Sequence, residues 1–250
     1  KTLQFTIGQE RVPFTIDAHR SPHQQYFANR SFIAKQVGNV RDVGAEVGYT
    51  WNVGFPIVLN AGVFNGSGLT NQKDYWTKGV NYSAKLQFLF PNLNLVLSTQ
   101  KIKPSDVTVT MYDGGITFHK GGFIAEAEYL YKHYSKNAFH DVHAFDGFAC
   151  YDIPVVNQKS FIKKVSPLVR YDFMSDHSDG TRYNATDDNL GELIINDYKR
   201  HRVTGGVTLS LAKPFISDIR INYEKYFYRN GGIAKTSEKD KFVIEFMTKF

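Results

Sequence analysis

Apolar and polar residues alternate with a period of two through most of this chain. In residues 41–51, valine, alanine, tyrosine and tryptophan fill the odd positions after Arg41, whereas Asp42, Glu46 and Thr50 fill even positions. Successive side chains of a β-strand point to opposite faces of its sheet, so the pattern predicts strands whose two faces meet different surroundings. The alternation recurs in residues 57–63, 83–90, 123–132, 202–211, 219–224 and 242–250.

The alternation and its interruptions predict about twelve strands. No segment has the apolar stripe of period 3.6 that an amphipathic helix needs, so we expect little helix. The predicted fold class is therefore all-β, with residues 1–250 forming a single domain. The strands are expected near residues 2–9, 41–52, 56–64, 78–90, 93–101, 107–118, 123–134, 142–152, 166–174, 198–211, 217–228 and 240–250.

The connections between these strands alternate in length. Short turns marked by Gly, Pro or Asn lie at residues 53–56, 91–92, 120–122 and 213–215, and longer polar connections lie at 11–40, 65–77, 175–197 and 229–239. Three links depart from this rhythm, since 102–106 and 135–140 are brief and 153–165 is long. Short turns at one end of the strands and long loops at the other are typical of outer-membrane β-barrels.

The composition is compatible with a protein that crosses a membrane on strands. Hydrophobic residues make up 42% of the chain, and no stretch approaches the ~18 consecutive apolar residues of a membrane helix. A barrel strand needs only its lipid-facing half to be apolar. We therefore predict an antiparallel transmembrane β-barrel. A soluble all-β protein is the alternative, but it would not be expected to carry Glu126, Arg202 and Arg220 on its more enclosed face.

Six short segments stand out, in this order along the chain: Gly8-Gln-Glu-Arg-Val-Pro-Phe14, Asn29-Arg-Ser31, Arg41-Asp-Val-Gly44, Ala61-Gly-Val-Phe-Asn-Gly66, Pro167-Leu-Val-Arg-Tyr-Asp172 and the aromatic strand 242–250. Together they resemble the phosphate-selective porin O/P family of bacterial outer membranes. This resemblance implies a sixteen-stranded, homotrimeric porin with one loop folded into the pore, of which this chain would supply about twelve strands, with roughly four preceding them. It also implies that the terminal Phe250 is needed for insertion into the outer membrane.

The long connection 11–40 concentrates positive charge. It carries Arg11, Arg20, Arg30 and Lys35 with a single acidic residue, and Arg41 follows it. A connection of this length is more often functional than a plain link. The resemblance implies that it dips into the pore, where a ring of guanidinium and ammonium groups would select anions. The alternative is a solvated extracellular loop whose bases contact anionic lipopolysaccharide.

The predicted inner wall is close to neutral. Its bases nearly cancel its acids, so we expect many of them to be paired scaffolding of the wall. Arg170, Arg202 and Arg220 are candidate pore residues with acidic neighbours. The bases are Lys85, Lys132, Arg170, Arg200, Arg202, Arg220 and Lys249, and the acids are Asp42, Glu46, Glu126, Glu128, Asp172, Glu224 and Glu245.

The sequence and the resemblance together predict a porin of the bacterial outer membrane. Small hydrophilic solutes would diffuse through it, with a preference for anions such as phosphate, which agrees with the net charge of +6. We expect outer-membrane lipid and lipopolysaccharide as surroundings, no nucleic-acid partner, no cofactor and no catalysed reaction. A structural barrel subunit of a larger transport or export complex, or an outer-membrane enzyme, are the alternatives. No acid, base and nucleophile can be assembled from the sequence to support the enzyme.

Overall fold

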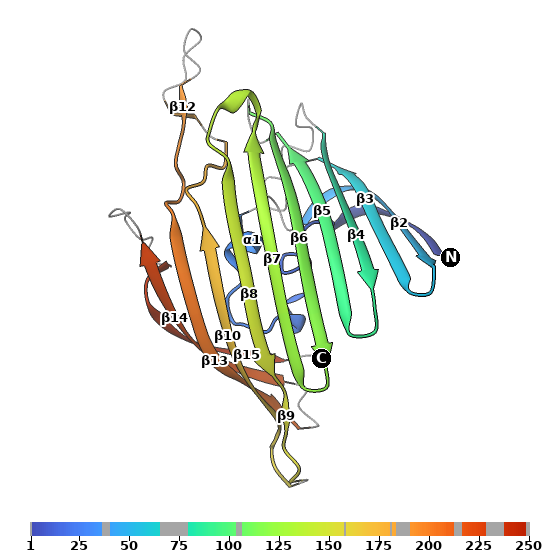
Figure 1. Ribbon diagram of the computed structural model, residues 1–250, viewed down its shortest axis with the longest axis vertical. Coiled ribbons are helices and arrows are strands. Elements are labelled where there is room, and N and C mark those ends of the chain that lie inside the picture. The colour runs from blue at the N-terminus through green and yellow to red at the C-terminus, as the bar shows by residue number, and fades with distance from the viewer. Residues whose placement is uncertain are drawn as a thin grey trace.

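One curved antiparallel sheet of 13 strands dominates the computed structural model (Figure 1). Its strands follow the chain order, and each long strand pairs with the next, so the sheet is a meander. The strands are β1 (Thr2–Arg11), β2 (Arg41–Asn52), β3 (Pro56–Phe64), β4 (Asn81–Leu89), β5 (Leu93–Ile102), β6 (Val109–Lys120), β7 (Phe123–Tyr134), β8 (Val142–Tyr151), β9 (Ile153–Pro154), β10 (Ile162–Met174), β13 (Arg200–Leu211), β14 (Ser217–Tyr228) and β15 (Lys241–Thr248).

Other regular structure is scarce in the described part of the chain. A two-stranded ribbon of β11 (Arg182–Tyr183) and β12 (Glu192–Leu193) follows β10, and the one short α-helix there is α1 (Phe32–Gln36). No helix among these residues is long and apolar enough to cross a bilayer. The structure describes residues 2–36, 41–65, 80–103, 107–157, 159–180, 182–183, 191–212, 217–228 and 238–248, so Lys249 and Phe250 lie outside it.

The all-β class and the antiparallel order of the long strands are confirmed, but the sheet is not closed. Strands β1 and β15 are its two edges and do not pair with each other. The diameter of a closed barrel grows with its number of strands. This sheet curves too gently for its two edges to meet (Figure 1). The predicted closed barrel is therefore not formed by the described strands.

The two faces of the sheet differ in polarity, as the alternation predicted. On the convex face, apolar side chains stand exposed, and one cross-strand row joins Leu3, Tyr49, Leu59, Leu86 and Leu97 over five strands. On the concave face, charged side chains are buried, among them Lys85, Glu128, Asp172, Arg202 and Glu224. A soluble protein has the opposite arrangement.

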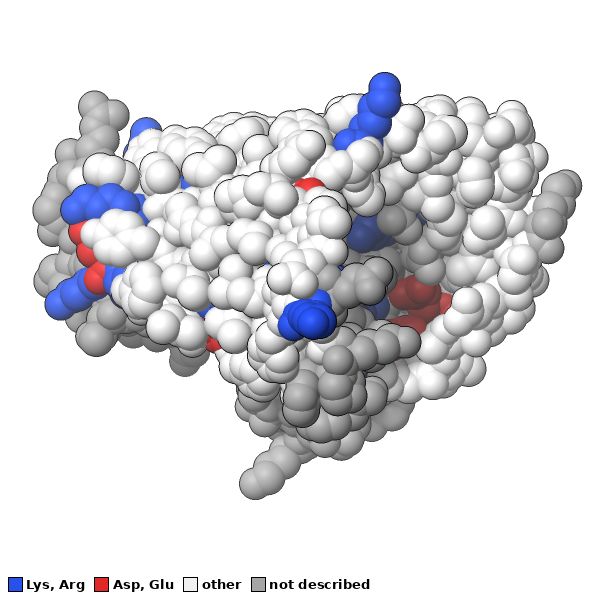
Figure 2. Space-filling view, turned by 90° about the horizontal axis from the view of Figure 1, so that it is seen from below, with Lys and Arg blue, Asp and Glu red and all other residues white. Residues whose placement is uncertain are grey.

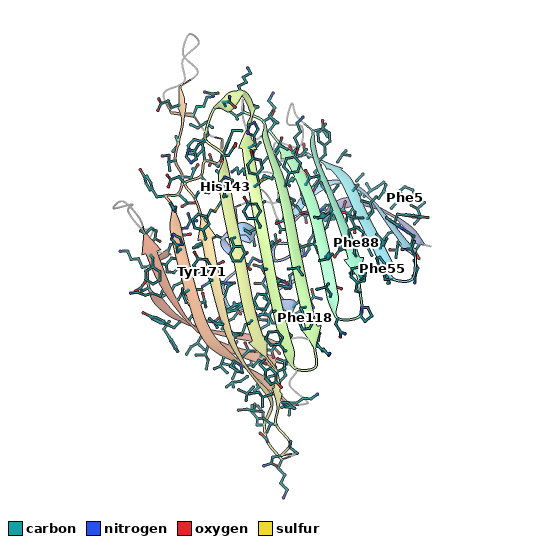
Figure 3. The ribbon with its side chains drawn as sticks, in the orientation of Figure 1. Phe5, Phe55, Phe88, Phe118, His143 and Tyr171 are labelled. Atoms are coloured by element: carbon teal, nitrogen blue, oxygen red, sulfur yellow. The ribbon has the colours of Figure 1, made fainter. Side chains whose placement is uncertain are left out.

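Aromatic rings mark both ends of the strands on the convex face (Figure 3). Phe55, Phe88 and Phe118 lie at the short-turn ends of their strands, and the rings of Phe55 and Phe90 are 4.3 Å apart. Tyr171 of β10 and His143 of β8 lie towards the other ends of their strands, at the side of the long connections. Two such bands flanking an apolar belt are typical of a protein wall that spans a bilayer.

Residues 12–36, which include α1, lie within the curve of the sheet and are called the in-folded segment below (Figure 1). Its apolar residues form a buried cluster with the inner side chains of the wall, towards the long-connection end. The cluster is Val12, Phe14, Phe32, Ile33, Phe64, Val107, Val109, Met111, Leu130, Tyr134, Val142, Ala144, Met174, Leu193 and Tyr226. This part of the concave space is therefore filled by an apolar core.

The apolar cluster predicts that the in-folded segment contributes to stability. Ile33 is fully buried at 0% exposure, so Ile33→Ala should lower the free energy of unfolding by about 2–5 kcal/mol. Val156→Ala, at a position 90% exposed in the link between β9 and β10, is the matched control and should change it by less than about 1 kcal/mol. Urea unfolding of the folded protein in lipid vesicles measures both. Equal effects of the two substitutions would show that the segment is not packed in this way.

Candidate functional site: the in-folded segment and the concave face

The in-folded segment is held against β4–β7 through its main chain. Thr15 adopts a left-handed conformation (φ 57°), which its surroundings enforce. Its N–H donates to Ser98 Oγ at 3.0 Å, its carbonyl accepts from Lys85 Nζ at 2.6 Å, and its hydroxyl accepts from the N–H of Ala18 at 3.3 Å. The next N–H, of Ile16, donates to the buried carboxylate of Glu128.

A glycine in β6 makes room for this contact. A Cβ placed on Gly115 would stand 2.5 Å from Cδ1 of Ile16, closer than real Cβ contacts allow. The missing side chain thus lets the segment approach the wall. Of the Gly114-Gly115 pair that interrupts the alternation, the position of Ile16 accounts for Gly115, whereas a Cβ on Gly114 would make only an ordinary contact with Leu97 at 3.7 Å.

The other end of the segment is held by three arginines of the opposite wall. Arg170 donates to the carbonyl of Asn29 at 2.9 Å, Arg202 to that of Arg30 at 2.7 Å, and Arg220 to that of Pro22 at 3.2 Å. In the reverse direction, the N–H of Phe32 donates to Asp172 and the N–H of Ala28 to Asn222. The wall thus satisfies the irregular backbone of the segment.

The same three arginines are also paired with carboxylates, as expected from their acidic neighbours on the predicted inner wall. Arg170 lies 3.0 Å from Asp172, and Arg202 lies 2.9 Å from Asp172 and 3.5 Å from Glu224. Arg220 lies 2.7 Å from Glu245. Because both carbonyls and carboxylates engage these guanidinium groups, Arg170, Arg202 and Arg220 are placed to hold the segment.

The structure brings together three of the arginines singled out in the long connection. Arg11 and Arg30 both donate to the carbonyl oxygen of Arg20, at 3.0 and 2.8 Å. Arg11 also donates to the carbonyl of Ala18, and Arg30 to the carbonyl of Asp17. The side chain of Arg20 turns instead to the wall, where it makes a bidentate pair with Glu126 at 3.0 and 2.6 Å.

The two remaining candidates of this group, Arg41 and Lys35, differ in how far the structure describes their side chains. Arg41 is exposed and stands opposite Arg11 in the β1–β2 pairing, so it extends the cluster of Arg11, Arg20 and Arg30. Lys35 belongs to α1, and its side chain lies outside the described part of the structure. We call Arg11, Arg20, Arg30 and Arg41 the arginine cluster.

Burial and charged neighbours both act on the titratable groups around this cluster. Burial lowers the pKa of His19 to about 4, and the charges of Lys85 and Arg11 contribute to the shift. His19 is therefore neutral near pH 7. Burial also lowers the pKa of Arg30 below its ordinary value; Asp17 opposes this shift, and Arg20 adds to it. Because burial disfavours every ion, only the smaller contribution of the basic neighbours favours an anion here.

A chamber of about 540 Å³ lies between the in-folded segment and the short-turn ends of the wall strands. Figure 2 views the molecule from that side and shows a hollow in which both basic and acidic side chains appear. The chamber's charges are largely compensated, since Lys164 lies 2.8 Å from Asp152, and Arg20 pairs with Glu126. Its polar lining includes His19, Arg20, His23, Gln24, Gln25, Lys85, Gln87, Asp152, Lys164, Ser166, Thr208, Ser210 and Asp218.

Sequence reasoning missed several inner groups. Asp113 and Asp146 are buried on the concave face, in the two segments where the alternation is least clear. The connection 175–197 is polar in sequence, yet His177 and Ser178 are buried against β7, where Lys132 donates to the carbonyl of Ser178 at 2.6 Å. In the described ranges, no group of three or more His, Cys, Asp or Glu side chains could hold a metal ion.

Comparison with known proteins gives no relative. The chain matches no protein-family model, no curated protein and no solved structure. The resemblance to the phosphate-selective porins therefore rests on the short segments of the sequence.

The pair of Arg20 and Glu126 predicts a coupling between the segment and the wall. Removing one partner leaves the other charge buried without its counter-ion, so Arg20→Gln or Glu126→Gln alone should cost about 3–5 kcal/mol. The double variant should cost clearly less than the sum of the two. Unfolding in lipid vesicles measures all three, and limited proteolysis reports release of the segment. Additive effects would show that the two side chains do not meet.

Proposed function

We propose that this chain forms most of the wall of a bacterial outer-membrane porin, through which small hydrophilic solutes diffuse with a preference for anions such as phosphate. The observation that carries the proposal is the reversal of the two faces. Apolar side chains such as Phe5, Ile7 and Phe246 are exposed outward, whereas Asp172, Arg202 and Glu224 are buried inward. A bilayer is the solvent in which an exposed apolar belt with aromatic borders is stable.

Closure of the barrel is part of this proposal. The edges β1 and β15 leave rows of backbone N–H and C=O groups that a bilayer cannot satisfy, because hydrocarbon offers no hydrogen bonds. Further strands must pair with both edges. The sixteen strands that the resemblance implies would supply them, and we propose a transmembrane β-barrel completed in this way.

The preference for anions is supported by the arginine cluster. Arg11 and Arg30 meet at a carbonyl oxygen, and the nearby His19 is kept neutral. Arg170, Arg202 and Arg220, which were also candidates, support it less, because the carboxylates of Asp172 and Glu245 offset their charges. In this account the solute passes the arginine cluster, and no reaction or cofactor is involved.

The assembly proposed is a homotrimer in outer-membrane lipid and lipopolysaccharide, without nucleic acid. The resemblance implies the trimer. The convex face of β1–β6 has a hollow of about 680 Å³ whose floor includes the small residues Ala45, Ala61 and Ala84. Small side chains allow close approach of a neighbouring surface, which agrees with a subunit contact there.

A second candidate is a structural barrel that does not conduct, within a larger transport or export complex. The apolar cluster around Phe32, Ile33 and Met111 favours it, because it fills the concave space towards the long connections. The two candidates differ in one property, namely whether an open path remains between the in-folded segment and the strands that complete the barrel.

Conductance in planar bilayers separates them. A porin should give stepwise openings. Across a chloride gradient at low salt, its reversal potential should be shifted towards the equilibrium potential of chloride. The structural barrel predicts no steps from protein whose insertion has been verified. An enzyme that is not a channel would also give none.

The arginine cluster predicts the origin of the selectivity. A unit charge acts on an ion at about 4 Å with about 1 kcal/mol in water, so Arg11→Gln with Arg30→Gln should lower the anion-to-cation permeability ratio about ten-fold at low salt. Lys120→Gln with Lys163→Gln removes the same charge from exposed positions at the short-turn rim and should leave the ratio within about two-fold. If the arginine variant keeps its full preference, the cluster does not form the filter.

A further inference from the structure

Hydrogen-bonded phenol and imidazole pairs occupy the convex face near the long-connection ends of β7, β8, β10 and β13. Tyr129 Oη lies 2.6 Å from Nδ1 of His143, and Tyr171 Oη lies 2.7 Å from Nδ1 of His201. A phenol that donates to Nδ1 fixes the neutral imidazole in the tautomer with its proton on Nε2. In that tautomer, Nε2 of each imidazole is an N–H donor.

A lysine and two phenylalanines complete a continuous patch around these imidazoles. Phe145, Phe173 and His201 form one cross-strand row on β8, β10 and β13. The ring of Phe173 lies 4.9 Å from that of His201, and Nζ of Lys199 stands 5.3 Å over it. We define the outer patch as His143, Phe145, Tyr171, Phe173, Lys199 and His201.

The acidic groups near the outer patch have described partners. Asp141 accepts hydrogen bonds from Tyr131 and from His133, both at 2.7 Å. Asp240 is paired with Lys225, and Asp176 accepts from the main-chain N–H of Lys199. The ammonium group of Lys199 lies over the ring of Phe173.

The aromatic pairs at the opposite rim of the convex face are of another kind. There Phe55 packs on Phe90 at 4.3 Å, Phe118 lies 6.2 Å from Phe123, and Tyr49 stacks on Trp51. The two borders of the wall thus differ in one respect: the phenol–imidazole hydrogen bonds that the structure describes lie at the long-connection border.

We propose that the outer patch binds the phosphate headgroup of a lipid in the leaflet on the long-connection side. The proposal rests on the membrane location inferred above. Lys199 and His143 would donate to phosphate oxygens, which take charge-assisted hydrogen bonds. Phe145 and Phe173 would contact the apolar part of the same molecule, which free phosphate does not have. A lipid carrying phosphate monoesters matches both halves of the patch.

The test measures lipid retention by the full chain in phosphatidylcholine nanodiscs. Diphosphoryl lipid A and the same lipid with both phosphates removed are the probes, and native mass spectrometry counts the copies kept after detergent extraction. The variant is His143→Gln with Lys199→Gln and His201→Gln. Lys120→Gln with Lys163→Gln, at the opposite rim, is the matched control. Protease protection verifies insertion of each protein before lipid is counted.

The wild-type chain should retain the phosphorylated lipid, and the patch variant should lower retention about ten-fold or more. The rim control should stay within about two-fold. Equal retention of the dephosphorylated lipid, or an unchanged patch variant, would overturn the proposal. Displacement of the lipid by inorganic phosphate alone would assign the patch to free phosphate instead. When the chain is tested together with the strands that complete the barrel, insertion without lipid retention refutes this proposal only, whereas failure to insert refutes the membrane location as well.

Discussion

This chain buries its charges and exposes its hydrophobic side chains, and the rest of the structure depends on that reversal. Arg202, Asp172 and Glu224 are fully enclosed on the concave face, whereas Ile7 is 85% exposed on the convex face. Burying a charge is unfavourable unless it is paired and hydrogen-bonded. Exposing an apolar face over the whole length of a sheet is unfavourable in water. Each strand therefore needs a polar interior on one side and an apolar solvent on the other.

The in-folded segment supplies the polar interior. Its irregular backbone needs hydrogen-bond partners, and the buried side chains of the wall provide them in both directions. Lys85, Arg170 and Arg202 donate to its carbonyls, whereas Glu128 and Asp172 accept from its N–H groups. Much of the charge inside the wall is thus explained by the segment rather than by a solute. The selectivity proposed here consequently depends on Arg11 and Arg30.

The alternation of the sequence was sufficient to predict the strands and their faces, because each strand meets two different environments. It failed where contacts with the segment override it. Asp113 lies two residues before Gly115, whose missing side chain makes room for Ile16. The burial of Phe14, Phe32 and Ile33 was not predicted, although these apolar residues stand out in a polar connection. Local periodicity also carries no information on the curvature of the sheet, so the open edges at β1 and β15 could not be predicted from it.

Spin labels along β13 test the reversal of faces most directly. Single cysteines at positions 203–210, in a Cys150→Ser chain reconstituted in lipid vesicles, report contact with oxygen, which concentrates in the bilayer, and with a water-soluble relaxation reagent. The account predicts a period of two in oxygen contact, with maxima at Val203, Gly205, Val207 and Leu209 and minima at Thr204, Gly206, Thr208 and Ser210. Uniform contact along the strand, or maxima at the second set of positions, would contradict it.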